Sequence, residues 1–144
     1  MKRIAVVTLT VATLAVTFAS TVRAADPPAD RVVAMYFHRT ERCPTCLKMG
    51  SYSEEAVKKG FTKQVKEGSV EFRYVDFQNK KNAALTKGYQ ISGPALVIAN
   101  IKENKVEQYK NLKDIWTKVR EKPEFLKYVG ANVEAYLKLS RSRH

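Results

Sequence analysis

Hydrophobic positions divide the chain into one apolar N-terminal stretch and a series of shorter periodic segments. Ile4 to Phe18 carries no charge, whereas apolar and polar residues alternate beyond residue 30. Arg31 to Phe37 is a compact apolar run that predicts a buried strand, and Ala95 to Ile101 predicts another. Val70 to Phe77 alternates with a period of two, which indicates a strand with one more apolar face.

Helical periodicity fills most of the remaining chain. A hairpin strand is expected from Val106 to Tyr109, after a turn at Glu103 and Asn104. Helices are expected in four segments: Pro44 to Val65, Asn79 to Lys87, Leu112 to Val119, and from Pro123 to Leu137. Gly50 and Gly60 weaken the first of these helices or divide it. The principal elements follow the order β-α-β-α-β-β-α. This order predicts an α/β domain with a central mixed sheet flanked by helices.

The N-terminal stretch has the layout of a secretory signal peptide. Lys2 and Arg3 form a positive region, the apolar stretch follows, and Val22 and Ala24 place small side chains at a cleavage site. The stretch is too short and too rich in threonine for a good membrane span, which needs about 20 mostly apolar residues. We therefore expect a signal peptide over 1–24, a short leader over 25–30, a domain over 31–139 and a basic tail over 140–144. The expected location is periplasmic or extracellular.

The chain is strongly basic, with 26 Lys and Arg residues against 14 Asp and Glu residues and a formal net charge of +12. These basic residues are scattered, and no Arg-rich stripe with interleaved aromatic residues is present. The sequence therefore does not indicate nucleic-acid binding. We interpret the charge as a solvated surface that attracts acidic partners or anionic membrane surfaces.

The candidate chemistry lies in the two cysteines, Cys43 and Cys46. They follow a predicted buried strand and begin a predicted helix, with Pro44 at the first helical position. This is the context of a redox-active C-x-x-C pair. Backbone N–H groups and the helix dipole favour a thiolate at Cys43, and the adjacent Arg42 should lower its pKa further. Cys46 lies one turn further on, where we expect it to be better shielded and to resolve a mixed disulfide.

Two other interpretations of the cysteine pair stay open. Two thiolates also suit a soft metal such as Cu(I) or Zn, although zinc usually takes four ligands and only His38 lies near in the sequence. An inert local disulfide is the other, but the stabilisation that a disulfide gives falls as its loop becomes shorter. The redox interpretation requires no metal and no organic cofactor.

The sequence resembles the thioredoxin-like superfamily, in particular exported bacterial members with a single CPTC motif. The resemblance runs through VVAMYFHRTERCPTC and again through YQISGPALVIANIKENKV. It implies the thioredoxin fold for nearly all of the mature chain. It also implies that Pro94 is the family's cis-proline beside the C-x-x-C, and that Gly93, Pro94 and Ala95 bind the substrate chain. Without this resemblance a trans bond would be expected, since most X–Pro bonds are trans.

The chain also departs from typical thioredoxins. Arg42 stands where they have a tryptophan, and the strand residues Met35, Tyr36 and Phe37 supply no buried acid to assist proton transfer at the resolving cysteine. The resemblance implies a monomeric thiol–disulfide oxidoreductase that acts on protein or small-molecule disulfides. A membrane thiol carrier would supply its electrons when it acts as a reductase. The alternatives are a soft-metal binding or sequestering protein and a binding module without catalytic activity.

Overall fold

Four strands form one mixed sheet in the order β2-β1-β3-β4. The computed structural model describes residues 26–142. The strands are β1 (Arg31–His38), β2 (Val70–Asp76), β3 (Ala95–Lys102) and β4 (Lys105–Asn111). β1 pairs with β2 in parallel and with β3 antiparallel, and β3 pairs with β4 antiparallel. The two central strands are the two compact apolar runs of the sequence, because both of their faces are buried.

The helices divide more finely than the sequence predicts. They are α1 (Pro44–Gly60), α2 (Thr62–Lys66), α3 (Ala83–Gly88) after a 3₁₀ turn η1 (Lys80–Asn82), α4 (Ile115–Lys118) and α5 (Lys122–Arg141). The helical segment expected from Pro44 to Val65 divides after Gly60, one of the two glycines at which a division was expected, because the φ of −130° and ψ of 41° at Phe61 are not helical. The periodicity continues through this break, because Phe61 and Val65 both pack against the same core.

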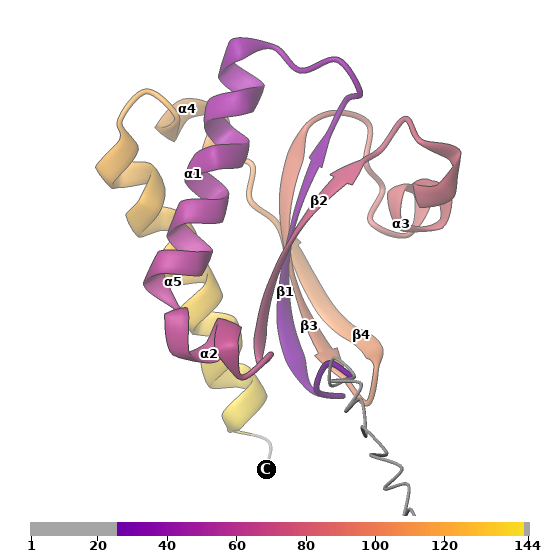
Figure 1. Cartoon of the computed structure of the whole chain (residues 1–144), viewed down its shortest axis with the longest axis vertical. Coiled ribbons are helices and arrows are strands. Elements are labelled where there is room, and N and C mark those ends of the chain that lie inside the picture. The colour runs from indigo at the N-terminus through magenta and orange to yellow at the C-terminus, as the bar shows by residue number, and fades with distance from the viewer. Residues whose placement is uncertain (1–25, 143–144) are drawn as a thin grey trace, which may run out of the picture.

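Helices cover both faces of the sheet (Figure 1). α1 and α5 lie side by side on one face, whereas α3 lies on the other. Alternate residues of β1 divide between the two cores: Val32, Ala34 and Tyr36 face α1 and α5, and Val33, Met35 and Phe37 face the side of α3. The structure is therefore an α/β domain with a four-stranded mixed sheet flanked by helices.

The apolar stripe predicted near the C-terminus is the buried face of α5. Its fully buried members include Phe125, Val129 and Val133, which pack against the core beneath α1. α5 continues to Arg141, so the first residues of the predicted basic tail belong to this helix. No helix within residues 26–142 is long and apolar enough to span a membrane. The predicted signal peptide lies outside the described residues.

The expected leader is attached to the hairpin between β3 and β4. The carbonyl of Ala29 accepts a hydrogen bond from the N–H of Asn104 at 2.9 Å, and the Asp30 carboxylate accepts one from the N–H of Glu103 at 2.8 Å. Glu103 and Asn104 both have positive φ values, of 49° and 61°. Positive φ at both central residues is typical of the tight hairpin turn that the sequence predicts here.

The strand register brings three chain segments to one edge of the sheet. β1 and β2 end together, because His38 pairs with Asp76 in the parallel ladder. β3 begins at the same edge, where Ala95 pairs with Phe37. The loop that leaves β1 at this edge leads directly into α1 (Figure 1). The two cysteines therefore lie at the carboxyl end of β1, close to the start of β3.

Candidate functional site

Cys43 is the N-cap residue of α1. Its backbone is extended, with φ −72° and ψ 161°, and Pro44 occupies the first turn, as the sequence predicts. The Cys43 sulfur accepts a hydrogen bond from the backbone N–H of Cys46 at 3.2 Å. This bond satisfies one of the N–H groups that the first turn of a helix leaves unpaired. The helix start thus holds the Cys43 sulfur in place through its own backbone.

The two sulfur atoms of the pair lie 2.7 Å apart, and both cysteines are free thiols. A disulfide has an S–S distance of about 2.05 Å, so an oxidant that takes two electrons and two protons from the pair would join the sulfurs with little movement. Cys43 is exposed, whereas Cys46 keeps only 7% of its surface accessible. One sulfur is therefore open to a substrate and the other is shielded behind it.

The two thiols also differ in acidity. A hydrogen bond from the Cys46 thiol, followed by the bond from the Cys46 N–H, lowers the pKa of Cys43. Burial is the largest cause that raises the pKa of Cys46, and the hydrogen bond that it gives to Cys43 raises it further. When the pair carries one negative charge, that charge therefore resides on Cys43.

Arg42 was expected to act on Cys43, and its guanidinium lies over the ring of Tyr74. Its guanidinium carbon lies 5.4 Å from the centroid of the Tyr74 ring, a cation–π arrangement. The leading causes that lower the pKa of Cys43 are hydrogen bonds within the pair itself. The Tyr74 hydroxyl in turn donates a hydrogen bond to Glu54 of α1 at 3.0 Å. Arg42 is thus held against β2, and its contribution to the acidity of Cys43 remains a prediction.

The loop between β1 and α1 is anchored to the end of β2. The Thr40 hydroxyl donates a hydrogen bond to the Asp76 carboxylate at 2.7 Å, and the Thr40 N–H donates one to the side chain of Gln78 at 3.0 Å. Asp76 also accepts a bond from the N–H of Gln78 at 2.9 Å. The hydrogen bond from Thr40 is the largest cause that lowers the pKa of Asp76. Sequence reasoning did not identify this anchor.

Tyr36 lies beneath the cysteine pair. It is fully buried, and its hydroxyl donates a hydrogen bond to the backbone carbonyl of Cys46 at 2.8 Å. Burial is the largest cause that raises the pKa of Tyr36, and the charges of Cys46 and Cys43 add to it. The hydroxyl therefore stays protonated and acts as a donor. The alternation of β1 could have revealed this residue, because it places Tyr36 on the face that α1 covers.

The structure corrects the expectation for Pro94. No peptide bond within residues 26–142 is cis, so the Gly93–Pro94 bond is trans and the predicted cis-proline is wrong. A trans bond is the state that an X–Pro bond favours unless its surroundings impose cis. Here Gly93 has open space around it, so the turn is not crowded there.

The segment of Gly93, Pro94 and Ala95 lies at the edge of the sheet where β1 ends, since Ala95 pairs with Phe37. It lines a cavity of about 370 Å³ together with Leu112 and Trp116. Neither cysteine lines this cavity. Trp116 is 46% exposed, which is unusual for so large an apolar side chain. This segment and α4 therefore line one cavity. Substrate binding by Gly93, Pro94 and Ala95 remains a prediction.

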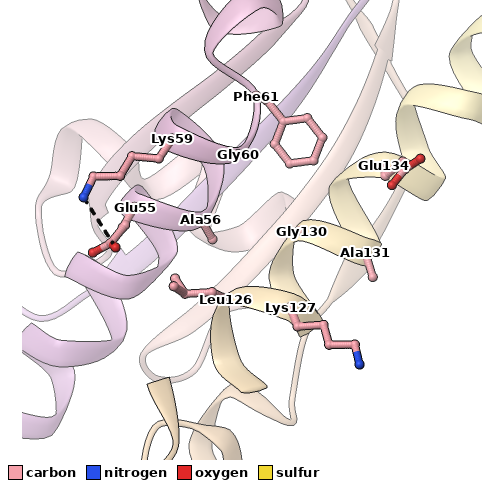
Figure 2. Close-up of a pocket in the computed structure, with 10 residues that line it drawn as sticks. All are labelled: Glu55, Ala56, Lys59, Gly60, Phe61, Leu126, Lys127, Gly130, Ala131 and Glu134. Carbon is pink, nitrogen blue, oxygen red and sulfur yellow. Dashed lines mark ion pairs between the residues drawn. The ribbon is translucent and has the colours of Figure 1, made fainter. Parts of the chain in front are cut away.

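A larger cavity lies elsewhere, between the second half of α1 and α5. Figure 2 shows that its walls come from these two helices and that Phe61 closes one end. Its volume is about 600 Å³, and small residues such as Ala56 and Gly130 leave the space open. Glu55 at its rim forms ion pairs with Lys59 and Lys122. None of the predicted site residues lines it.

The metal alternative depends on the donor atoms that lie near the two cysteines. Within residues 26–142 no three or more His, Cys, Asp or Glu side chains gather as metal ligands would. His38 is engaged otherwise: its Nδ1 lies 2.8 Å from the carbonyl oxygen of Arg39, and its ring stacks with Tyr36. A metal held by this chain alone would therefore have two sulfur ligands.

The site offers one exposed, more acidic thiol and one shielded thiol within bonding reach. These are the parts that two-step thiol–disulfide exchange needs, an attacking sulfur and a resolving sulfur. The inference of function rests on this arrangement. The sequence matches no model of a known protein family, and no curated protein matches it.

Proposed function

We propose that this protein is an exported thiol–disulfide oxidoreductase with a thioredoxin-like fold. One observation carries the proposal: an exposed N-cap cysteine lies 2.7 Å, sulfur to sulfur, from a buried cysteine in the first turn of the same helix. A local disulfide here would add little stability, because it closes a very short loop. The acidity of the outer thiol instead suits exchange chemistry.

In the reducing direction the reaction has two steps. The Cys43 thiolate attacks one sulfur of a substrate disulfide, so that a mixed disulfide forms while the substrate S–S bond breaks and the first substrate thiol leaves. The Cys46 thiol then loses its proton, and its sulfur attacks the Cys43 sulfur and releases the second substrate thiol. The cysteine pair has then lost two electrons and two protons, which the substrate has gained. The reverse sequence oxidises a substrate dithiol.

The arrangement of the elements supports the thioredoxin-like part of the proposal. The C-x-x-C begins the helix that follows a central strand, and that helix shares one sheet face with the C-terminal helix, while α3 covers the other face. The trans bond at Pro94 departs from the family pattern. We propose that substrate binds at the cavity that Gly93, Pro94 and Ala95 line together with Trp116.

Export and the electron source belong to the same proposal. The tripartite pattern of residues 1–24 supports secretion, and disulfides persist in the compartments outside the cytosol. Electrons for reduction there would come from a membrane thiol carrier. Mass spectrometry of protein from the native envelope fraction should give an N-terminus at Ala25 or within a residue or two. A full-length cytosolic form as the main species would remove export from the proposal.

Insulin reduction in the presence of dithiothreitol tests the activity. The wild-type protein should accelerate precipitation of the insulin B chain in metal-free buffer, and both Cys43→Ser and Cys46→Ser should lose most of this acceleration. Dialysis of the reduced protein against Zn(II) or Cu(I) tests the alternative in parallel. Tight stoichiometric metal binding without insulin reduction would support a soft-metal protein and contradict the oxidoreductase. A protein that neither reduces insulin nor binds metal would be a binding module without catalytic activity.

A further inference from the structure

We propose that Tyr36 is a positioning residue of the cysteine site: its hydroxyl holds the Cys46 carbonyl and thereby sets the balance between the dithiol and the disulfide. The inference rests on the proposed function, because it concerns the redox equilibrium of the same pair. In the sequence, Tyr36 was noted only as one of three strand residues that supply no buried acid, and this proposal gives it a role.

The position of Tyr36 follows from its place in β1. It pairs with Tyr74 of β2 and Leu96 of β3 in the ladder, so it lies in a central strand, on the face that α1 covers. Its side chain has no accessible surface, and its hydroxyl reaches the Cys46 carbonyl oxygen at 2.8 Å. A rigid strand thus holds one end of this contact, and the first turn of α1 provides the other.

The rings of Tyr36 and Tyr74 pack against each other next to this hydrogen bond. The Tyr36 and Tyr74 rings meet edge to face, with centroids 6.1 Å apart. Gly50 of α1 lies directly against both, since a Cβ atom there would be 2.9 Å from a carbon of each ring. The absence of a side chain at Gly50 therefore lets α1 approach the sheet closely enough for the hydroxyl to reach Cys46.

The hydrogen bond affects the charge state of the thiols. The Tyr36 hydroxyl bonds to the turn that carries the two thiols, and the charges of both thiols raise its pKa, so the hydroxyl proton in turn adds positive potential around the pair. Without the hydroxyl, a thiolate in the pair should be less stable. The reduced form would then lose part of its stabilisation, and the equilibrium would shift toward the disulfide.

Other groups surround the same hydroxyl and could also respond to the charge on the pair. The titratable or charged side chains that act on Tyr36, apart from the two thiols, are Tyr74 and Arg42, and the His38 ring stacks against it. Glu54 reaches this cluster through its hydrogen bond with the Tyr74 hydroxyl. The test must therefore remove the Tyr36 hydroxyl alone.

The experiment compares Tyr36→Phe with Tyr52→Phe in the full mature protein. Tyr52 lies further along α1 than the cysteines, where it is partly buried and its ring packs against Phe125 of α5. Each protein is equilibrated with reduced and oxidised glutathione, and the pH profile of Cys43 alkylation is recorded. Tyr36→Phe should shift the equilibrium toward the disulfide by about three- to ten-fold, the range for one ordinary hydrogen bond, and move the alkylation profile to higher pH. Tyr52→Phe should leave both unchanged.

The outcomes separate the two proposals. If the wild-type pair forms a reversible disulfide but Tyr36→Phe matches it in both measurements, the role of Tyr36 is refuted and the oxidoreductase stands. If the wild-type pair never equilibrates with glutathione, both proposals fall. If Tyr36→Phe does not fold, NMR of the wild-type protein tests the proposal instead, by comparing the ¹³Cζ resonance of Tyr36 in the dithiol and disulfide forms. That resonance should move when the disulfide closes, and a resonance that stays fixed overturns the inference.

Discussion

The buried Tyr36 hydroxyl lies 2.8 Å from the carbonyl oxygen of Cys46, so the central strand of the sheet contacts the first turn of the cysteine helix directly. Around this contact, the outer thiol is exposed and the inner thiol is shielded. The chemistry of the site follows from this difference between two residues in one helical turn.

The first prediction concerns the order of thiol reactivity. Because its pKa is lowered and its side chain is exposed, Cys43 should be alkylated well before Cys46 at mildly acidic pH. Peptide mapping of the reduced protein after brief treatment with iodoacetamide measures this. Cys46→Ser should also accumulate mixed disulfides with substrates, and Cys43→Ser should not. Faster labelling of Cys46 would reverse the assigned roles.

The second prediction concerns the close approach at Gly50. Alanine is normally favoured over glycine within a helix by about 1 kcal/mol. At Gly50 the new Cβ would meet the buried Tyr36 ring at 2.9 Å, and such overpacking typically costs about 1–3 kcal/mol. We expect Gly50→Ala to lower the free energy of unfolding in urea despite the gain in helix propensity.

Gly130 provides the matched control for this variant. It lies within α5, and a Cβ atom added there would have no neighbouring heavy atom within 4 Å, so Gly130→Ala should raise the free energy of unfolding by up to about 1 kcal/mol. Equal stabilisation by both substitutions would show that α1 does not press against the two tyrosine rings.

The third prediction concerns the loop before Cys43. Hydrogen bonds from Thr40 and from the Gln78 N–H lower the pKa of Asp76 below its unfolded value. Their contribution to stability is therefore complete above the unfolded pKa of about 3.9 and is lost as the pH falls through the lower folded value. At neutral pH, Asp76→Ala should speed amide exchange of Thr40 and slow insulin reduction. Asp26→Ala serves as an exposed control, and equal exchange in both variants would contradict the anchor.

The strands were predictable because their signal is local. β1 and β3 are continuous apolar runs of the length of a buried strand, and β2 alternates, so composition and period suffice. The start of α1 was equally readable from Pro44 after the first cysteine. The break after Gly60 was signalled by that glycine, but Gly50 gave the same signal and lies within an unbroken helix, so the sequence could not choose between them.

The remaining features of the site depend on contacts between distant segments. Thr40 and Asp76 are 36 positions apart and meet only because β1 and β2 pair in parallel. The isomer at Pro94 is also set by its surroundings, and the family pattern predicted it wrongly. The family pattern has an acid in this strand, whereas the structure places the neutral hydroxyl of Tyr36 against the backbone carbonyl of Cys46.

The fourth prediction concerns substrate docking at the cavity lined by Trp116. Trp116 is 46% exposed and lines a cavity with Pro94, at the end of the sheet where Ala95 begins β3. If substrates bind there, Trp116→Ala should raise the KM for a peptide disulfide several-fold and leave the alkylation profile of Cys43 unchanged. Val106→Ala, at an equally exposed apolar residue of β4, is the control. An unchanged KM in the tryptophan variant would place docking elsewhere.

The central claim is that Cys43 and Cys46 form a reversible two-electron couple. Redox titration of the wild-type protein against glutathione, read by the mass of the alkylated protein, tests this most directly. We predict one transition between a doubly alkylated dithiol and an unalkylated form with an intramolecular Cys43–Cys46 disulfide, identical when approached from either direction. A protein that stays doubly alkylated at every glutathione ratio would contradict the account. So would a disulfide that is reduced neither by glutathione nor by dithiothreitol.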